Sequence, residues 1–193
     1  MKINAISDAY YIKGTGYKNL KKYLDTRYEP GLFEHAAGEV GIQFNGGILT
    51  VTKYPIFKYI QLCQSVAEKV NKSLEDLTID SSRFVLEEDL NGIYKFFIRV
   101  GGPERTIHSF PQITKTYCNF VRYHIEDNKS GSLILRGETV AEINEWNKVA
   151  LKGAMTGILN VCKRPIKTFE VANIGELDVD GDRFIITKIK ISY

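Results

Sequence analysis

Apolar residues recur at two different spacings along the chain, and the spacing changes near residue 119. In the first part, Tyr17, Leu20, Leu24 and Tyr28 are three or four positions apart, which places them on one face of a helix. A second helix is predicted to open at Pro55, because proline is favoured in the first helical turn. Its apolar stripe consists of Ile56, Ile60, Cys63, Val66, Ala67 and Val70.

Further helices are predicted before residue 119. A short helical piece capped by Ser73 is expected over 74–77, followed by a helix that begins near 81 and carries apolar residues up to 100. Asn91-Gly92 is a candidate weak point or break within it. Gly101-Gly102 should end that helix, because paired glycines disfavour helix interiors. A helix that starts at Pro103 should then be kinked or ended by Pro111.

Residues 38–53 are compatible with two structures. Apolar residues flank Asn45-Gly46-Gly47, which is typical of a β-hairpin turn. The same residues could form an irregular crossover that passes over the helices. The sequence leaves both alternatives open.

In the second part of the chain, apolar residues alternate with polar ones. This period of two predicts strands over 120–125 and 132–136, and two more over 167–177 and 183–191. Asp180-Gly181 supplies the turn between the last two strands. The strands are expected to form one antiparallel sheet.

A long helix over 139–162 is predicted between the two pairs of strands. Thr139 and Glu142 have the spacing of a capping box at its start. Gly153 and Gly157 are four residues apart, so one face of this helix is nearly flat. Such a face allows another backbone to approach, and we expect the helix to lie close on the sheet. Alternatively, the small residues leave room for a flat ligand between helix and sheet.

The order of elements predicts an α+β fold. A mainly helical half over 1–118 precedes a β-β-α-β-β half over 119–193, in which a four-stranded antiparallel sheet packs on a long helix. No linker or repeat of fixed period interrupts the chain, so 1–193 is interpreted as a single domain.

Composition excludes several classes of protein. The chain has 193 residues and a net charge of +3, which is too small a bias to indicate nucleic-acid binding. No apolar stretch is long enough for a membrane span. The chain begins without a signal-peptide pattern, and Cys63, Cys118 and Cys162 show no paired spacing, so we expect a cytoplasmic protein with free thiols.

Residues that could carry chemistry are few. His35, His108 and His124 lie in no recognisable metal-binding motif. Residues 178–182 resemble part of a calcium loop but fit a hairpin tip better, and the glycines of 13–16 lack a complete phosphate-binding motif. We therefore predict no catalytic residues, no metal and no cofactor, and interpret the protein as non-enzymatic.

The chain resembles the haem nitric-oxide/oxygen-binding (H-NOX) domains in the order of its elements. Vinyl-reductase-like sensor domains and TRAPP trafficking subunits share the α/β part of that fold, and the sequence is most similar to an uncharacterised myxobacterial domain family, which would make it bacterial. The motifs that carry the resemblance are Ile12 to Gly16 with the basic helix to Arg27-Tyr28, Tyr54-Pro55, Gly102-Pro103-Glu104-Arg105, and Leu133 to Gly137 before the glycine-bearing helix.

The resemblance implies a haem site only if the haem-binding residues are present. H-NOX domains bind the haem iron through a histidine on a helix ahead of the sheet, and His108 has about that place in the sequence. They also hold the haem propionates with a Tyr-x-Ser-x-Arg motif on the second strand. This chain has Leu135-Arg136-Gly137-Glu138-Thr139 there, so that motif is missing.

The function predicted from these observations is a signalling or regulatory module that binds a protein partner or a second copy of itself. A small apolar ligand would fit the same interpretation, with Gly153 and Gly157 beside it. The partner surface would include Tyr17, Tyr23, Arg27 and Tyr28, since tyrosine and arginine are enriched at interfaces, although these tyrosines could also cover the protein's own core. The alternatives are a haem-dependent gas sensor that uses His108 and an enzyme whose active site the sequence does not reveal.

Overall fold

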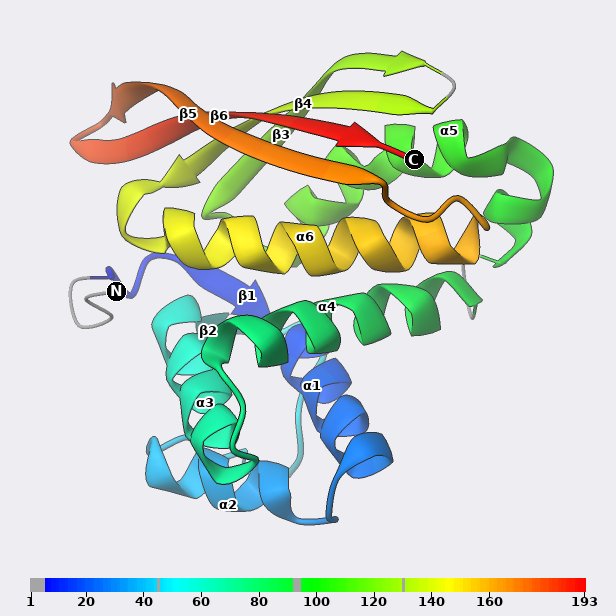
Figure 1. The fold of residues 1–193 in the computed structure, drawn as a ribbon. Helices are drawn as coiled ribbons and strands as arrows, with labels where there is room; N and C mark the ends of the chain where they lie inside the picture. The colour runs from blue at the N-terminus through cyan, green and yellow to red at the C-terminus, as the bar shows by residue number, and fades with distance from the viewer. Residues whose placement is uncertain (1–5, 45, 92–94, 130) are drawn as a thin grey trace.

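The structure is a computed structural model that describes residues 6–44, 46–91, 95–129 and 131–193. It has the predicted α+β architecture, with helices first and a sheet in the second half (Figure 1). The elements are β1 (Tyr11–Lys13), α1 (Gly14–Arg27), α2 (Leu32–Glu39), β2 (Lys53–Pro55), α3 (Ile56–Lys69), α4 (Leu74–Asn91), α5 (Lys95–Tyr117), β3 (Val121–Lys129), β4 (Ser132–Val140), the short 3₁₀ helix η2 (Ala141–Ile143), α6 (Asn144–Val161), β5 (Thr168–Val179) and β6 (Asp182–Ser192).

The first three helices pack around a cluster of aromatic rings. Tyr17 of α1 is fully buried, and its ring centre lies 5.1 Å from those of Tyr54 and Tyr59 and 5.5 Å from that of Phe44. Rings at these distances and tilted angles attract one another beyond the area they bury. The helical periodicity around Tyr17 is therefore confirmed as a core-facing stripe.

The sheet consists of four antiparallel strands in the order β3-β4-β6-β5, as predicted. Along β4, Leu133 and Leu135 are fully buried while Ile134 and Arg136 are half-buried on the other face. The turn between β5 and β6 has positive φ at Asp180 (55°) and Gly181 (87°), which matches the favoured two-residue hairpin turn. These alternations direct one face of the sheet toward α6.

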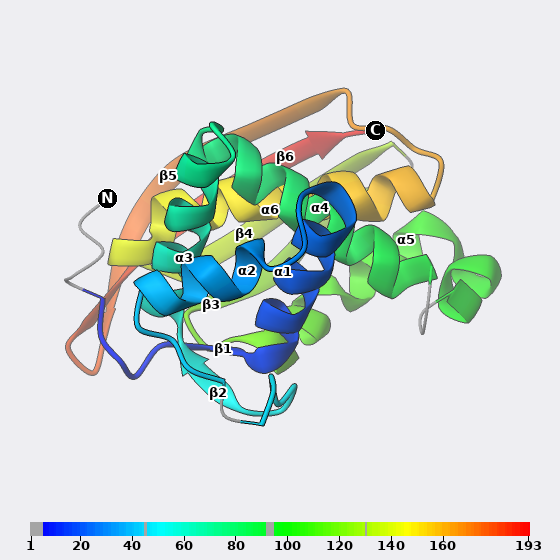
Figure 2. The same ribbon diagram turned by 90° about the horizontal axis from the view of Figure 1, so that it is seen from below.

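Helix α6 lies between the sheet and α4 (Figures 1 and 2). The glycines of α6 face α4, so the expectation that they lie close on the sheet is wrong. A Cβ at Gly153 would come within 2.4 Å of the Ile79 carbonyl oxygen, and one at Gly157 within 2.6 Å of the Arg83 carbonyl oxygen. The two glycines therefore allow the backbones of α4 and α6 to touch.

The predicted helix start at Thr139 is wrong. Thr139 belongs to β4, where it pairs with Val121 on one side and Ile185 on the other. The helix α6 begins only at Asn144, and no side chain caps it. The backbone of Thr139 pairs with strands on both sides, so this residue does not cap the helix. Its hydroxyl instead accepts a hydrogen bond from Asn147 at 3.1 Å.

Helix α4 is one continuous helix, whereas the sequence predicted two. Ser73 caps it, since the backbone N–H of Asp76 donates to Ser73 Oγ at 2.9 Å. Ser81 does not begin a new helix, because it is buried and its hydroxyl donates to the carbonyl of Thr78 within the same helix at 3.3 Å.

Helix α5 continues through Gly101, Gly102 and Pro103, so the predicted break at these residues is also wrong. Figure 1 shows the helix bending around one end of α6 and running back beneath the sheet. Its residues Ile107 and Phe110 are buried in the core. Tertiary packing of this kind regularly overrides the low helix propensity of glycine and proline.

The described residues between α2 and β2, 40–44 and 46–52, form an irregular crossover rather than a hairpin. Within the described part of this segment no strand precedes β2, and β2 pairs with β1 rather than with a neighbouring segment of the crossover. Asn45, at the centre of the predicted hairpin turn, lies outside the described residues. Across the described residues, no helix is both long enough and apolar enough to cross a membrane.

The close contact between α4 and α6 can be tested by adding one methyl group. We expect Gly153→Ala to lower the free energy of unfolding by about 1–3 kcal/mol, because the new Cβ must displace the backbone of α4. Chemical denaturation of the purified chain measures this change.

The matched control is Gly38→Ala in α2, where a Cβ meets nothing within 4 Å. We expect this substitution to be neutral or to stabilise by up to about 1 kcal/mol, because alanine is the better helix former. If both variants had the stability of the parent, α4 and α6 would not be in contact at Gly153.

Candidate functional site

A pocket of about 170 Å³ lies where the helical half meets the sheet. We call it the inter-helix pocket. Its walls come from α4, α5, α6 and the start of β3, with smaller contributions from β1, α1 and α3. Leu86 and Leu90 line it from α4, Phe110 from α5, and Trp146 and Ala150 from α6.

The described residues that line this pocket include none that is charged and no histidine. Their polar groups are hydroxyls, a thiol, a carboxamide and an indole N–H. Burying an ionised group beside such a lining would cost several kcal/mol, since no opposite charge compensates it. The pocket is therefore suited to a neutral, apolar molecule.

The volume of the inter-helix pocket limits the size of such a molecule. Pockets for drug-sized ligands and cofactors are typically about 300–1,000 Å³, and a cavity of roughly 150 Å³ accommodates benzene or xenon. At about 170 Å³, this pocket corresponds to a molecule the size of a single aromatic ring.

One wall of the pocket carries a buried hydrogen-bonded triad. The Asn147 side-chain amide donates to the Tyr123 hydroxyl at 2.7 Å and to the Thr139 hydroxyl at 3.1 Å. All three residues are buried. Burial raises the pKa of Tyr123, so its hydroxyl stays neutral over the physiological range. The triad thus joins β3, β4 and α6 beside the pocket without introducing a charge.

Cys118 is a neutral thiol in the pocket wall. Burial raises its pKa to about 12, and its Sγ lies 3.6 Å from the carbonyl oxygen of Thr114. The fully buried Cys63 has its pKa raised to about 12 for the same reason. Because the thiolate is the nucleophile and the metal ligand, neither cysteine is poised for catalysis or metal binding.

His108 lies on the exposed side of α5. The buried residues of this part of the helix are Thr106, Ile107 and Phe110, and of these three Phe110 lines the inter-helix pocket. His108 is thus on the same helix as the pocket wall, but it is not among the lining residues. The other histidines, His35 and His124, are also exposed.

The second strand of the sheet, β4, carries no positive charge on its inner face. Leu135, Gly137 and Thr139 face inward, while Arg136 lies on the outer face and pairs with Glu138 at 2.8 Å. A Cβ at Gly137 would lie 2.8 Å from Thr187 Oγ1 and 3.2 Å from the Tyr123 ring. The absence of a side chain at Gly137 therefore makes room for Thr187 and Tyr123.

Gly153 and Gly157 do not line the inter-helix pocket, because they face the backbone of α4. The small residues of α6 that do line it are Ala150 and Ala154. Room for a ligand thus occurs between the helices and the start of the sheet, next to the glycine contact rather than at it.

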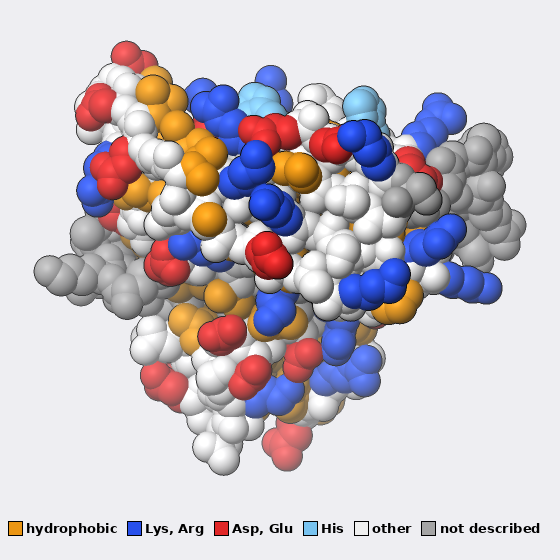
Figure 3. Space-filling model, turned by 45° about the horizontal axis from the view of Figure 1, so that its top comes forward, with side chains coloured by type: hydrophobic (Ala, Val, Ile, Leu, Met, Phe, Trp, Pro, Cys, Tyr) orange, Lys and Arg blue, Asp and Glu red, His pale blue; other side chains and the backbone are white. Residues whose placement is uncertain are grey.

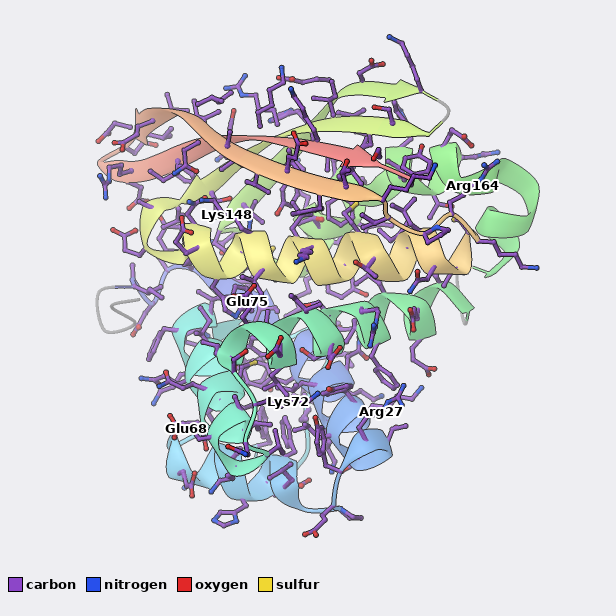
Figure 4. The ribbon with its side chains drawn as sticks, viewed as in Figure 1. Arg27, Glu68, Lys72, Glu75, Lys148 and Arg164 are labelled. Atoms are coloured by element: carbon purple, nitrogen blue, oxygen red, sulfur yellow. The ribbon has the colours of Figure 1, made fainter. Side chains whose placement is uncertain are left out.

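Two of the tyrosines predicted for a partner surface belong to the core. Tyr17 is 0% exposed and Tyr23 is 3% exposed, so neither can contact a partner, and the prediction is wrong for both. Helical periodicity does not distinguish a core stripe from a contact stripe. Arg27 is exposed at the outer end of α1 (Figure 4), and Tyr28 is half-buried.

The glycine motif at 13–16 is a helix entry, and two of its backbone N–H groups already have acceptors within the chain. The N–H of Gly14 donates to Thr52 O at 2.8 Å, and that of Thr15 donates to Thr50 O at 3.1 Å. The acidic residues of 178–182 form a hairpin tip, closed by a bond from Gly181 N–H to Asp178. Among the described residues no three His, Cys, Asp or Glu side chains could hold a metal together.

The outer face of the sheet carries both basic and acidic side chains (Figure 3). His124 and Arg136 lie beside Glu138 there, at 3.9 Å and 2.8 Å. Large apolar side chains are exposed on β5, where Ile174 is 54% exposed and Leu177 is 39% exposed. Charges of both signs on one face neutralise one another and indicate no anionic or cationic partner.

Sequence reasoning missed most of the pocket wall. The sequence patterns did not single out Trp146 or Asn147, although Trp146 is the only tryptophan of the chain, and they marked Cys118 only as a free thiol. A polar Asn147 at a core-facing helical position was the available signal, because a buried amide must find hydrogen-bond partners.

Comparison with known proteins shows that the fold is H-NOX-like. An oxygen-binding H-NOX domain related to soluble guanylate cyclases, in its oxygen complex, matches with a TM-score of 0.68 and 14% identity over 94% of this chain and 96% of that one. An Fe(II) unliganded H-NOX protein from K. algicida matches with a TM-score of 0.69 and 13% identity over 94% and 96%. No family model and no curated protein matches the chain. Identities this low show the fold alone.

The buried triad can be tested by replacing its central residue with an apolar one of similar size. We expect Asn147→Leu to lower the free energy of unfolding by about 1–3 kcal/mol, because the hydroxyls of Tyr123 and Thr139 lose their partner. Thermal and denaturant unfolding measure the loss.

The control is Asn160→Leu on the same helix, where the side chain is exposed and donates to Glu87 Oε1 at the surface. A change within about 0.5 kcal/mol is expected there. Equal effects of the two substitutions would argue against a buried triad.

Proposed function

We propose that this chain is a non-enzymatic sensor or signalling module that binds a small, neutral, apolar ligand in the inter-helix pocket. The single observation that carries the proposal is the uncharged lining of a pocket of about 170 Å³. Clefts of this kind, mostly apolar with a few convergent polar groups, are the usual sites of small-molecule binding. The H-NOX-like fold supports a sensing role, since solved domains of this fold include an oxygen-binding one.

The position of the pocket supports signal transmission. Helices α4 and α6 both form its walls, and the same two helices make the glycine contact between the helical half and the sheet half. A ligand that pushes on Leu86 or Ala150 acts directly on that contact. A change in the relative position of the two halves is therefore the expected output of ligand binding.

The likeness to solved H-NOX structures favours a second candidate, a haem-dependent gas sensor. Among the similar structures, one concerns haem redox potential and porphyrin distortion, with a TM-score of 0.71 and 14% identity over 94% of this chain. This likeness supports the gas sensor more strongly than it supports a module that only binds a protein partner.

The residues of the inter-helix pocket do not fit haem. Among the described lining residues there is no histidine, and the buried Cys118 remains a neutral thiol. The same described lining contains no arginine or lysine that could pair with two propionates. His108, the expected iron ligand, is exposed. For these reasons the geometry supports the neutral ligand better.

A protein partner or a second copy of the chain remains part of the proposal, as the receiver of the signal. Arg27 is exposed and Tyr28 is half-buried beside it, which supports a contact at the outer end of α1. Both residue types are enriched at protein interfaces.

Binding of a single-ring molecule is the direct test, and the only tryptophan reports on it. We expect toluene to change the intrinsic fluorescence of the purified full chain in a saturable way, because Trp146 lines the pocket. Ala150→Leu should abolish the response by filling part of the pocket. Lys152→Leu, an exposed position on the same helix, is the matched control and should keep it. No saturable response in the parent chain would refute the proposed ligand class.

The haem candidate has its own test. We expect the full chain incubated with haemin to take up less than one equivalent after gel filtration and to show no sharp Soret band. We also expect His108→Ala to leave this result unchanged, because His108 lies outside the pocket. If the parent chain bound one equivalent of haem and His108→Ala did not, the proposed neutral ligand would be wrong and the haem-dependent gas sensor would be the function.

A further inference from the structure

Two aliphatic side chains near the end of the crossover are exposed to water. Val51 is 78% exposed and Leu49 is 60% exposed, and they are the two most exposed large apolar side chains among the described residues. Figure 2 shows the segment that leads into β2 projecting from one edge of the molecule, beside β1. Single exposed apolar residues are ordinary, but two on one projecting loop indicate a surface that another body covers.

The loop that carries these two side chains is held against the start of α1. The N–H of Gly14 donates to Thr52 O at 2.8 Å. The N–H and the hydroxyl of Thr15 both donate to Thr50 O, each at 3.1 Å. A partner therefore does not have to order the loop when it binds, which lowers the entropic cost of binding.

Three lysines lie around this loop. Lys13 and Lys53 are directly opposite each other in the β1–β2 pair, and directly opposed residues point to the same face of a sheet. Lys18 follows Gly14 by one helical turn, so it lies on the face of α1 that the loop contacts. Lys18 and Lys53 are exposed, and Lys13 is half-buried. We call Leu49, Val51 and these three lysines the lysine–aliphatic surface.

No carboxylate on the segments that form this surface compensates the three lysines. Residues 9–24 and 40–67 contain no Asp and no Glu. Across the part of the chain that the structure describes, neither Lys13, Lys18 nor Lys53 makes an ion pair. Lys53 lies over the Tyr11 ring, with its Nζ 4.5 Å from the ring centre, which leaves its charge uncompensated. Since like charges directly opposite in a strand pair repel, an anionic surface over Lys13 and Lys53 would be favourable.

The exposed apolar side chains of β5 have different neighbours. Ile174 and Leu177 are less exposed than Leu49 and Val51, and their strand carries three acidic residues and no lysine or arginine. Exposed aliphatic side chains therefore occur together with uncompensated positive charge at the crossover and not on β5.

The shape of the lysine–aliphatic surface fits a lipid bilayer better than a protein. A stable protein interface buries about 800 Å² on each partner and depends on anchors that are seated in pockets. Here two aliphatic side chains project from a loop, which is a small apolar area. A bilayer has no fixed shape, accepts projecting apolar side chains at its headgroup boundary, and attracts lysines when its lipids are anionic.

We propose that the lysine–aliphatic surface binds the headgroup region of a membrane that contains anionic lipids. Leu49 and Val51 enter the boundary between headgroups and acyl chains, and Lys13, Lys18 and Lys53 contact the anionic headgroups. The binding is peripheral and reversible, because a few aliphatic side chains and lysines anchor a protein only weakly. This inference goes beyond the proposed function and does not depend on the inter-helix pocket.

Flotation with lipid vesicles tests the role of charge. We expect the full chain to bind vesicles of phosphatidylcholine with about 30% phosphatidylserine at least tenfold more tightly than vesicles of phosphatidylcholine alone. Lys18→Gln combined with Lys53→Gln should weaken binding to the anionic vesicles about 25-fold, since each lysine near such a surface contributes a factor of about five. The matched control is Lys190→Gln, an exposed position on β6, which should bind like the parent chain.

A second pair of variants tests the role of the aliphatic side chains. Val51→Ser should weaken binding to the anionic vesicles roughly 5- to 10-fold, because its side chain no longer leaves water on binding. Ile174→Ser, at an exposed apolar position on β5, should leave binding unchanged. All these substitutions replace side chains at the surface, and equal melting temperatures would verify that the fold is kept.

Insertion of the loop has a spectroscopic signature. The fluorescence of Val51→Trp should shift to shorter wavelength when anionic vesicles are added, because the new indole leaves water. Ile174→Trp is the matched control and should show no shift.

Each outcome has a definite meaning. No binding to vesicles, or equal binding to both kinds, would overturn the inference and leave a protein as the remaining partner for this surface. Binding that Val51→Ser leaves unchanged, or that Lys190→Gln weakens as much as the loop lysines do, would show general attraction of a basic chain to anionic lipid and would also overturn it. None of these outcomes changes the proposed ligand of the inter-helix pocket.

Discussion

The structure depends on the direct contact between the backbones of α4 and α6. Gly153 and Gly157 make this contact by having no side chain, since a Cβ on either would collide with a carbonyl oxygen of α4. With α6 held against the sheet on its other side, the same contact joins the helical half to the sheet half (Figure 1). It also sets the distance between α4 and α6 in the wall of the inter-helix pocket, because Leu86 and Ala150 line the pocket beside the two glycines. A wider spacing between α4 and α6 would open the pocket toward solvent, and the apolar side chains that line it would then be exposed to water.

The distribution of charge separates the pocket from the surface. The outer face of the sheet carries paired charges of both signs, whereas the described lining of the pocket has hydroxyls, a thiol, an amide and an indole (Figure 3). Burial keeps Tyr123 and Cys118 in their neutral forms. The described lining of the inter-helix pocket is therefore neutral, whereas a haem site would require cations for the propionates and a histidine for the iron. The fold and the lining thus point to different ligands, and the lining consists of the residues that a ligand would touch.

Much of the fold could be predicted from the sequence because its signals are local. The alternation of β4 and β6, the turn at Asp180-Gly181 and the stripe around Tyr17 follow from periodicity and turn chemistry alone. The errors occur where distant residues compete with a local signal. Thr139 has the spacing of a helix cap, but pairing with β3 and β6 holds it in a strand. Ser81 has the chemistry of a helix start, and the Gly101-Gly102 pair has that of a helix end. Packing nevertheless keeps α4 continuous through Ser81 and α5 continuous through the two glycines.

The sequence by itself determined the α+β order of elements, the period of the four strands of the sheet and of the helix around Tyr17, and the presence of a flat face at Gly153 and Gly157. The tertiary structure alone decided which backbone comes close, which of Tyr17 and Arg27 faces solvent, and that His108 points away from the pocket. It also brought Trp146 and Cys118 into one wall with residues from several other elements. The physical reason is that periodicity identifies which face of an element is buried but carries no information about the element that packs against that face. The partner of a face, and any pocket left beside it, depends on the packing of segments that are far apart in the chain.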